Sequence, residues 1–301
     1  DQNTAVGAVA LLANTTGAYN TAVGRSALAA NTTASYNTAV GKSALGSNTT
    51  GSALVAIGFQ AAENTLTDSD TIAIGSNAAR NATSSGSVVI GSQANSTGVM
   101  TGDNNVLIGY QSGYNMTSGA SNVTVGKDSL LANTTGSAST AVGHAALSAA
   151  TTGGQNSALG YLALQDLTTA TGNTGIGYQA GKDITTGTNN TFIGNNSGIA
   201  QTTATDNTAV GHATLAANTS GDGLVAVGSN CLDANTTGSN NTGIGRSALG
   251  SNTEGNKNTA FGKDSLLANT TANNNTSVGY QALKANTTGA QNTAVGSGAL
   301  D

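Results

Sequence analysis

The chain has 301 residues, of which 37% are hydrophobic and only 8% are charged, and its formal net charge at pH 7 is −5. The few cations form no run, so the composition lacks the electrostatic footprint of a nucleic-acid-binding protein. No stretch approaches the roughly 18 consecutive apolar residues of a membrane-spanning helix, which predicts that the chain does not insert into a membrane.

One short unit is repeated along the whole chain. Its glycines lie 17 residues apart, except for one step of 16 and one of 18 around Gly91, from Gly7, Gly24 and Gly41 to Gly296. The consensus, written around that glycine, is N-T-A-V-G-x-x-A-L-x-A-N-T-T-G-x-x. A strict period of this length predicts a single repeat array over residues 1–301 rather than compact domains.

The first segment of each unit, N-T-A-V, reads as a strand. The residue before the glycine is apolar in all eighteen copies, as in Val6, Ile57 and Phe261, and the residue two places earlier is β-branched everywhere except Ser157. Alternation with period 2 indicates a strand with one buried face. We expect these two columns to point inward and the alanines between them, such as Ala22, to point outward.

The second segment follows the repeat glycine, which supplies a turn. Four residues after that glycine, a leucine column runs through Leu11, Leu28 and Leu45 to Leu300, and we expect it to be the buried face of a second strand continued by Ala13, Ala30, Ala132, Ala217 and Ala268. A second turn follows the N-T-T triplet. The sequence therefore predicts an all-β, parallel β-solenoid of about eighteen 17-residue coils with two short strands each. Frequent Asn, Thr and Gly oppose the helical alternative.

Stacking of such coils at about 4.8 Å per coil predicts a rod about 85 Å long in which equal residues form ladders. The asparagines at the start of the first strand, including Asn3, Asn20 and Asn37, are expected to hydrogen-bond along the axis in a structural role. Alanine strips expected on the outside suggest lateral packing into a homo-oligomer, with a trimer favoured. The strips comprise Ala5, Ala22 and Ala39 in the first segment and Ala27, Ala44 and Ala248 in the second.

The coils over residues 54–127 depart from the pattern. The threonine of the first strand becomes Val or Ile, and the leucine column is replaced by Ala62, Ala79, Asn95 and Gly113. The two irregular spacings also fall here. Our hypothesis is that these irregular coils form a bend, a thickened segment or a binding patch.

The column directly after the repeat glycine concentrates long side chains. It holds Arg25, Lys42, Phe59, Tyr110, Lys127, His144, Tyr161, Tyr178, His212, Arg246, Lys263 and Tyr280. Two interpretations stay open: a solvated turn that tolerates long side chains, or a receptor-contact ridge with aromatics for stacking and cations for acidic groups.

Other candidate sites are weaker. We find no arrangement of residues expected for catalysis, a cofactor or a metal, and we expect no enzymatic activity.

The doubled Thr column, for example Thr15 and Thr16, suggests either capping of turns or an ice-binding array. Sequons occur at Asn14, Asn31, Asn48 and Asn133. The single cysteine, Cys231, stands where the repeat usually has Ala or Ser and is expected to be a small buried or half-buried side chain.

Three units carry a resemblance to known repeats. Residues 20–33, 241–253 and 277–289 read NTAVGRSALAANTT, NTGIGRSALGSNT and SVGYQALKANTTG. They resemble repeats of phage tail-fibre-like proteins and of the heads of trimeric autotransporter adhesins. The resemblance implies trimeric, elongated fibres on a virion or cell surface and, from the adhesin heads, a left-handed parallel β-roll. The chain departs from these families in its 17-residue repeat, and we expect no chaperone domain, coiled-coil stalk or membrane anchor within residues 1–301.

Together these observations predict a structural, non-enzymatic segment of a phage tail fibre or bacterial surface adhesin that mediates attachment. The expected partners are further copies of the chain, a cell-surface glycan or protein receptor, and further repeats stacked end to end. The alternatives are a self-assembling extracellular filament subunit and an ice-binding solenoid.

Overall fold

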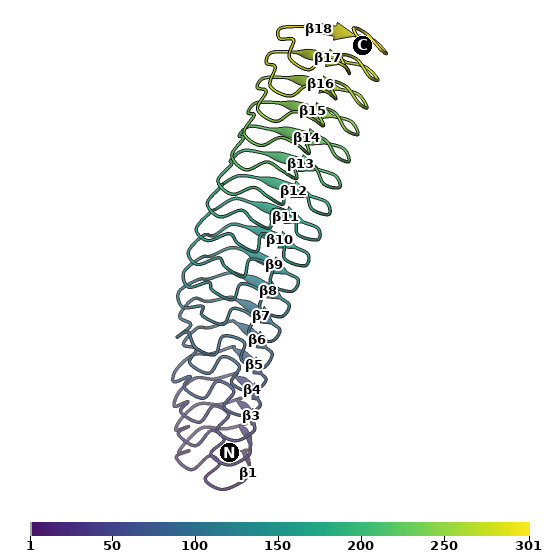
Figure 1. Ribbon diagram of the computed structural model, residues 1–301. Coiled ribbons are helices and arrows are strands. Elements are labelled where there is room, and N and C mark those ends of the chain that lie inside the picture. The colour runs from purple at the N-terminus through teal and green to yellow at the C-terminus, as the bar shows by residue number, and fades with distance from the viewer. Residues whose placement is uncertain (1) are drawn as a thin grey trace. The chain divides into compact units, whose positions relative to one another are not determined.

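The computed structural model describes residues 2–301 and confirms an all-β parallel solenoid with one coil per repeat (Figure 1). The chain divides into two compact units, Asp1–Gln155 and Asn156–Asp301. Each unit contains nine parallel strands of three residues. Within each unit, every strand pairs with the strand of the next coil in exact repeat register, for example Thr21 with Thr38 and Val23 with Val40.

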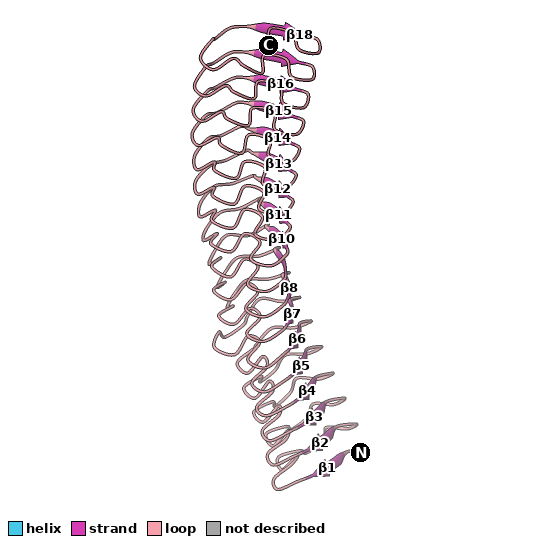
Figure 2. Ribbon diagram, turned by 45° about the vertical axis from the view of Figure 1, so that its right-hand side comes forward, coloured by secondary structure: helices cyan, strands magenta, loops and turns pink. Residues whose placement is uncertain are grey.

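The strands recur at the same place in every coil, and turns make up the rest (Figure 2). The first unit contains β1 (Thr4–Val6), β2 (Thr21–Val23), β3 (Thr38–Val40), β4 (Val55–Ile57), β5 (Ile72–Ile74), β6 (Val88–Ile90), β7 (Val106–Ile108), β8 (Val123–Val125) and β9 (Thr140–Val142). The second unit contains β10 (Ser157–Leu159), β11 (Thr174–Ile176), β12 (Thr191–Ile193), β13 (Thr208–Val210), β14 (Val225–Val227), β15 (Thr242–Ile244), β16 (Thr259–Phe261), β17 (Thr276–Val278) and β18 (Thr293–Val295).

The predicted inward and outward faces of the strand were wrong. The middle residue is buried, with Ala22 and Ala39 both at 0% exposure, whereas the apolar residue before the glycine is half-buried or exposed, at 53% for Phe261. Because side chains alternate along a strand, an error of one residue in phase exchanges the two faces. Ala27, Ala44 and Ala248 are also at 0% exposure, so the alanine strips belong to the core except at Ala5 in the first coil and offer no continuous surface for lateral packing.

The predicted second strand is also wrong, although its leucine column is buried as expected. Leu28 and Leu45 are at 0% exposure but have φ of 48° and 49°, which is a left-handed conformation rather than a strand. The alanines two residues further on, such as Ala30, are half-exposed and do not continue the core. Hydrogen bonds still join the coils here, as from Leu28 N to Ala44 O at 3.0 Å.

The repeat glycine makes the corner between the strand and this segment. Gly58 has a φ of 136°, a region that side chains other than glycine rarely occupy. A Cβ at this position would lie 2.5 Å from the carbonyl oxygen of Gly75 in the next coil. Backbone conformation and close stacking of coils therefore both require glycine here.

Two buried asparagine columns form polar ladders inside the coils, and the first of them, which includes Asn37, confirms the structural role predicted for it. Asn37 donates from Nδ2 to the carbonyl of Gly51 at 2.9 Å and accepts from Leu54 N at 2.9 Å. The second column, which includes Asn48, donates to the same Gly51 carbonyl at 3.0 Å. Turn carbonyls and amides that would otherwise be buried without partners are thereby satisfied.

Replacing Asn37 with alanine is expected to destabilise its coil by about 2 kcal/mol, because the buried Leu54 amide loses its acceptor. Hydrogen exchange of the Leu54 amide and the urea midpoint would measure the effect. Asn37→Ser is the control, since Ser87 occupies the equivalent position and its Oγ accepts from Asn105 N at 3.2 Å. Equal losses in both variants would contradict the assigned role of the acceptor.

Where a strand has a large inner residue, the leucine column has a small residue beside it. Phe192 replaces the usual alanine in β12 and is fully buried, while Gly181 and Gly198 replace the leucines beside it. A Cβ at either glycine would lie within 2.5 Å of the Phe192 ring. Leu107 of β7 faces Gly113 in the same way. In the coils of Phe192 and Leu107, a large inner strand residue is thus matched by glycine in the leucine column.

The irregular coils of residues 54–127 keep the regular strand arrangement. Strands β4 to β8 pair with the repeat register across both unusual spacings, including Ile74 with Ile90 and Ile90 with Ile108. Turns therefore absorb the missing and the additional residue. What distinguishes this stretch is its outward side chains, which are aliphatic in both outward columns of five successive strands and are mostly half-buried.

Candidate functional site

All twelve side chains predicted to form the ridge are exposed. They project from the corner that follows the repeat glycine, so consecutive members lie on adjacent coils. Within the first unit the ridge is interrupted by Ser76 and Ser92, and within the second by Asn195 and Ser229. The ridge therefore consists of short runs rather than one continuous line.

Neighbouring ridge residues contact one another. Lys42 Nζ lies 5.3 Å from the centre of the Phe59 ring, and Lys263 Nζ lies 5.5 Å from that of Tyr280. At these separations the ammonium groups gain a cation–π attraction to the rings. Lys263 also pairs with the adjacent Asp264 at 3.5 Å. Part of the positive charge on the ridge is therefore already balanced within the chain.

Tyr161 and Tyr178 are stacked on each other, with ring centroids 5.3 Å apart and planes only 8° apart. Each ring thus covers one face of its neighbour. Both rings are exposed, at 46% and 47%. A ligand approaching this pair from outside meets mainly ring edges and phenolic hydroxyls, which favours hydrogen bonding over the ring stacking suggested by the sequence.

A second stacked pair lies outside the predicted ridge. Tyr19 and Tyr36 stack at 5.1 Å with planes 4° apart, and both rings are exposed. They occupy the column one residue before the buried asparagine, at the corner that precedes the strand. Their spacing of 17 residues would have revealed this pair in the sequence.

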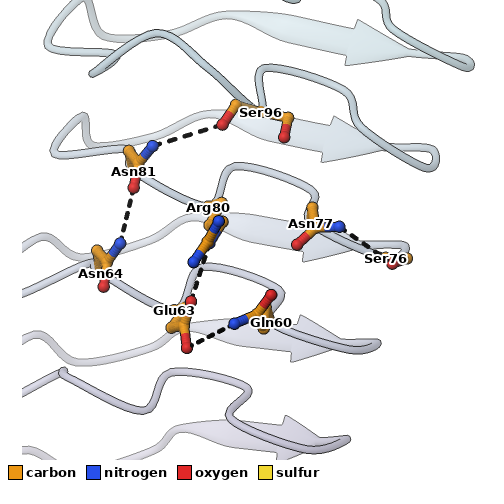
Figure 3. Close-up of polar contacts among 8 residues, drawn as sticks. All are labelled: Gln60, Glu63, Asn64, Ser76, Asn77, Arg80, Asn81 and Ser96. Atoms are coloured by element: carbon orange, nitrogen blue, oxygen red, sulfur yellow. Dashed lines mark hydrogen bonds and ion pairs between the residues drawn. The ribbon is translucent and has the colours of Figure 1, made fainter.

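A polar cluster lies beside the leucine segment of the irregular coils (Figure 3). Arg80 Nε pairs with Glu63 Oε2 at 2.9 Å, and Gln60 Nε2 donates to Glu63 Oε1 at 2.9 Å. The residues that follow Glu63 and Arg80 in the sequence also contact each other, because Asn64 Nδ2 donates to Asn81 Oδ1 at 2.7 Å. These groups satisfy each other across coils, and the ion pair is half-buried, with side-chain exposures of 41% at Arg80 and 18% at Glu63.

Hydroxyls of the doubled Thr column are largely used by the fold. Thr15 Oγ1 donates to the Thr32 carbonyl at 2.9 Å, and Thr49 Oγ1 donates to that of Leu66 at 2.9 Å. The first threonine of each pair therefore bridges adjacent coils. The second threonine, as in Thr33, is exposed, whereas the first is half-buried in most coils, as at Thr49. The capping interpretation accounts for the first column, and the doubled array does not present two free rows of hydroxyls.

The repeated sequons coincide with the second asparagine ladder. Asn31, Asn48 and Asn133 are at 0% exposure. Their Nδ2 atoms, where a glycan would be attached, donate to buried acceptors such as the Ala34 carbonyl at 3.1 Å from Asn31. A glycan on these residues is incompatible with the folded coil.

Residues 2–301 contain no pocket and no group of His, Cys, Asp and Glu side chains arranged to hold a metal ion. In the same part of the chain, no helix is long and apolar enough to cross a membrane. No family model matches the chain. No curated protein matches it either.

Cys231 is buried at 0% exposure, as predicted. Its Sγ occupies space left by Gly243, where a Cβ would lie 2.6 Å from the sulfur. Burial raises the pKa of the Cys231 thiol to about 12, and the negative charge of Asp233 acts in the same direction. The folded chain therefore holds this thiol in its neutral form.

We expect Cys231 to resist iodoacetamide at pH 8 in the native protein and to react fully in denaturant. Because its folded pKa lies above the unfolded value of about 9, its contribution to stability is complete below pH 9 and declines toward pH 12. Urea unfolding across this pH range would measure the decline. Cys231→Ala, which restores the usual residue, should show a smaller alkaline loss; an identical loss would assign the effect to other groups.

Proposed function

We propose that this protein is a non-enzymatic structural segment of an extracellular fibre, of the phage tail-fibre or bacterial surface-adhesin type, and that the ridge is its attachment surface. The observation that carries the proposal is the exposure of all twelve ridge side chains on a scaffold whose other repeat columns are mostly small or used in the core. The ridge collects five of the nine Lys and Arg residues of the chain.

The coil architecture supports a display role. Each coil is fixed to the next by backbone hydrogen bonds and asparagine ladders, so successive ridge side chains are held about one strand spacing, roughly 4.8 Å, apart. Repeated weak contacts to a surface polymer or an array of receptors add up when several sites can engage together. The cations and phenolic hydroxyls suit an acidic or hydroxyl-rich partner such as a cell-surface glycan. A homo-oligomer, with a trimer as the expected form, is part of this proposal.

The test is binding of the labelled full chain to a glycan array and to a panel of bacterial cells. A variant carrying Tyr161→Ser, Tyr178→Ser, Lys263→Ser and Tyr280→Ser should lose at least about tenfold in binding, since serine occupies the same column at Ser76 and Ser229. Binding that depends on the cations should also weaken with salt.

The matched control is Tyr19→Ser with Tyr36→Ser, which removes the stacked pair from a different corner. Its binding should equal that of the unmodified chain. Equal binding by the ridge variant, or no binding by the unmodified chain to any glycan or cell, would refute the ridge as the attachment surface.

One observation favours ice binding as a second candidate, on a different surface from the doubled threonines. In the second unit the outward face of the strands carries Thr174, Thr191 and Thr208, with Ile176, Ile193 and Val210 beside them. Hydroxyl and methyl groups thereby repeat at the strand spacing. A thermal-hysteresis measurement on the full chain decides this candidate, and the absence of hysteresis eliminates it.

A further inference from the structure

Two groups of three ridge side chains have the same order of residue types, which is arginine, lysine and an aromatic residue on successive coils. The first triad is Arg25, Lys42 and Phe59 in the first unit, and the second triad is Arg246, Lys263 and Tyr280 in the second unit. Backbone hydrogen bonds join the coils directly after each ridge position, as from Ser43 N to Arg25 O at 2.9 Å. The two triads can therefore be compared residue by residue.

The triads differ in the charge beside the lysine. Lys263 Nζ lies 3.5 Å from a carboxylate oxygen of Asp264, whereas the residue after Lys42 is Ser43. Within residues 2–301, neither Arg25 nor Lys42 forms an ion pair. The Phe59 ring, whose centre is 5.3 Å from Lys42 Nζ, attracts the ammonium without neutralising its charge. The first triad thus keeps both of its positive charges.

The sequence around the first triad also lacks negative charge. Residues 2–62 contain no Asp or Glu, and the following Glu63 pairs with Arg80 at 2.9 Å. Among the cations of the described chain that form no ion pair, only Arg25 and Lys42 occupy one column on adjacent coils. Their backbones lie one strand spacing, about 4.8 Å, apart, so both side chains can reach the same ligand.

A single anionic group suits this pair of side chains. The planar guanidinium of Arg25 can donate two parallel hydrogen bonds to a carboxylate or a phosphate, and the ammonium of Lys42 adds a compact positive charge. Both side chains are exposed and neither can accept a hydrogen bond, so a neutral hydroxyl group is matched less well than an anionic oxygen.

From the unbalanced charges of the first triad, we infer that Arg25 and Lys42 together bind one anionic group of a surface polysaccharide, a uronic-acid carboxylate or a phosphodiester. The neighbouring Asp264 weakens the same interaction at the second triad. This inference rests on the proposed function in taking the ridge as the attachment surface, and it names the chemical class of the partner.

The test is an NMR titration of the isotope-labelled full chain with three short probes. Trigalacturonic acid carries carboxylates, a glycerol-phosphate trimer carries phosphodiesters, and maltotriose is neutral. We expect at least one anionic probe to shift the amide signals of Arg25 and Lys42, with an affinity about threefold higher than at Arg246 and Lys263, which is the size of effect that an exposed ion pair produces. The binding should weaken with salt. The anionic probe that binds identifies the group as carboxylate or phosphodiester.

Two reciprocal substitutions test the role of the neighbouring carboxylate. Asp264→Ser gives the second triad the serine of the first and should strengthen binding there about threefold, whereas Ser43→Asp should weaken binding at the first triad by a similar factor. Serine and aspartate both fit this column, with φ of 59° at Ser43 and 57° at Asp264. Because one of the two expected changes is a gain, misfolding of the variants would not produce both results.

An absence of shifts at Arg25 and Lys42 with both anionic probes, equal affinity at the two triads, or no gain in the Asp264→Ser variant would each overturn the inference. Equal shifts with maltotriose would also overturn it, because the ligand would then be recognised without its charge. The ridge variant that tests the proposed function leaves Arg25 and Lys42 intact. Cell attachment and anion binding can therefore fail separately.

Discussion

Replacing Gly58 with alanine is expected to destabilise the first unit by more than about 3 kcal/mol. The backbone φ of 136° is itself unfavourable for alanine by about 1–3 kcal/mol. The added Cβ would also lie 2.5 Å from the Gly75 carbonyl oxygen, so adjacent coils would have to separate. Urea unfolding followed by circular dichroism would measure the loss, and hydrogen exchange would locate it to the coils around β4 and β5.

Gly46→Ala is the matched control for this prediction. Gly46 is not in the positive-φ conformation, its nearest contact to an added Cβ is 3.3 Å, and the preceding coil has Ala29 at the same position. This substitution should leave stability unchanged or raise it slightly, because it restricts the unfolded chain. If both variants were equally stable, the repeat glycine would not have the steric role assigned to it.

Replacing Phe192 with alanine is expected to destabilise the second unit by about 3–5 kcal/mol, because the fully buried ring would leave a cavity between Gly181 and Gly198. Gly198→Leu alone should also be strongly destabilising, since its Cβ would overlap the ring. The measurement is the urea midpoint of each variant.

Combining Phe192→Ala with Gly181→Leu and Gly198→Leu should recover most of the lost stability. The triple variant restores alanine in the strand and leucine in its column, as in the coil of Leu215. Leucine is compatible with the backbone here, because Leu215 has a φ of 52° and Gly198 has one of 60°. Additive losses, with no recovery in the triple variant, would show that the two columns do not compensate each other in volume.

The sequence was sufficient to predict the solenoid but not the orientation of its strand. The apolar column through Ile57 and Phe261 was more hydrophobic than the alanines beside it, and this misled the assignment of the buried face. In a coil this narrow, the strand faces a leucine across a short distance, so the inner position requires a small residue such as Ala39. The hydrophobicity of a residue type does not reveal how much side-chain volume the inner strand position can hold.

The second segment carried a sequence signal that indicates turns rather than a strand. Its buried column contains Leu, Ala, Asn and Gly but no Val, Ile or Thr, from Leu11 to Leu300. β-branched residues are favoured in strands and are strongly disfavoured at positive φ. Their absence from a buried column therefore predicts a left-handed backbone, as the φ of 49° at Leu45 shows.

The exposure of the ridge followed from the sequence, whereas its internal contacts did not. A column of Arg, Lys and Tyr after a turn glycine is expected to face solvent. The sequence also places Tyr161 and Tyr178 on adjacent coils. It does not define the rotation of the rings, which decides that their faces cover each other. The aliphatic outward side chains of β4 to β8 were similarly visible as a departure at residues 54–127, but only the observed phase of the strand placed them, as at Ile72, on the outer face.

The coil with Phe192 also bears on how a chain of near-identical units folds correctly. A protein that looped out one whole repeat would restore nearly every hydrogen bond along the stack, so the common coils discriminate poorly against such slippage. Phe192 fits only between Gly181 and Gly198, and a displacement by one repeat would bring a leucine such as Leu215 against its ring. We therefore expect rare size-matched coils of this kind to disfavour structures in which a whole repeat is looped out.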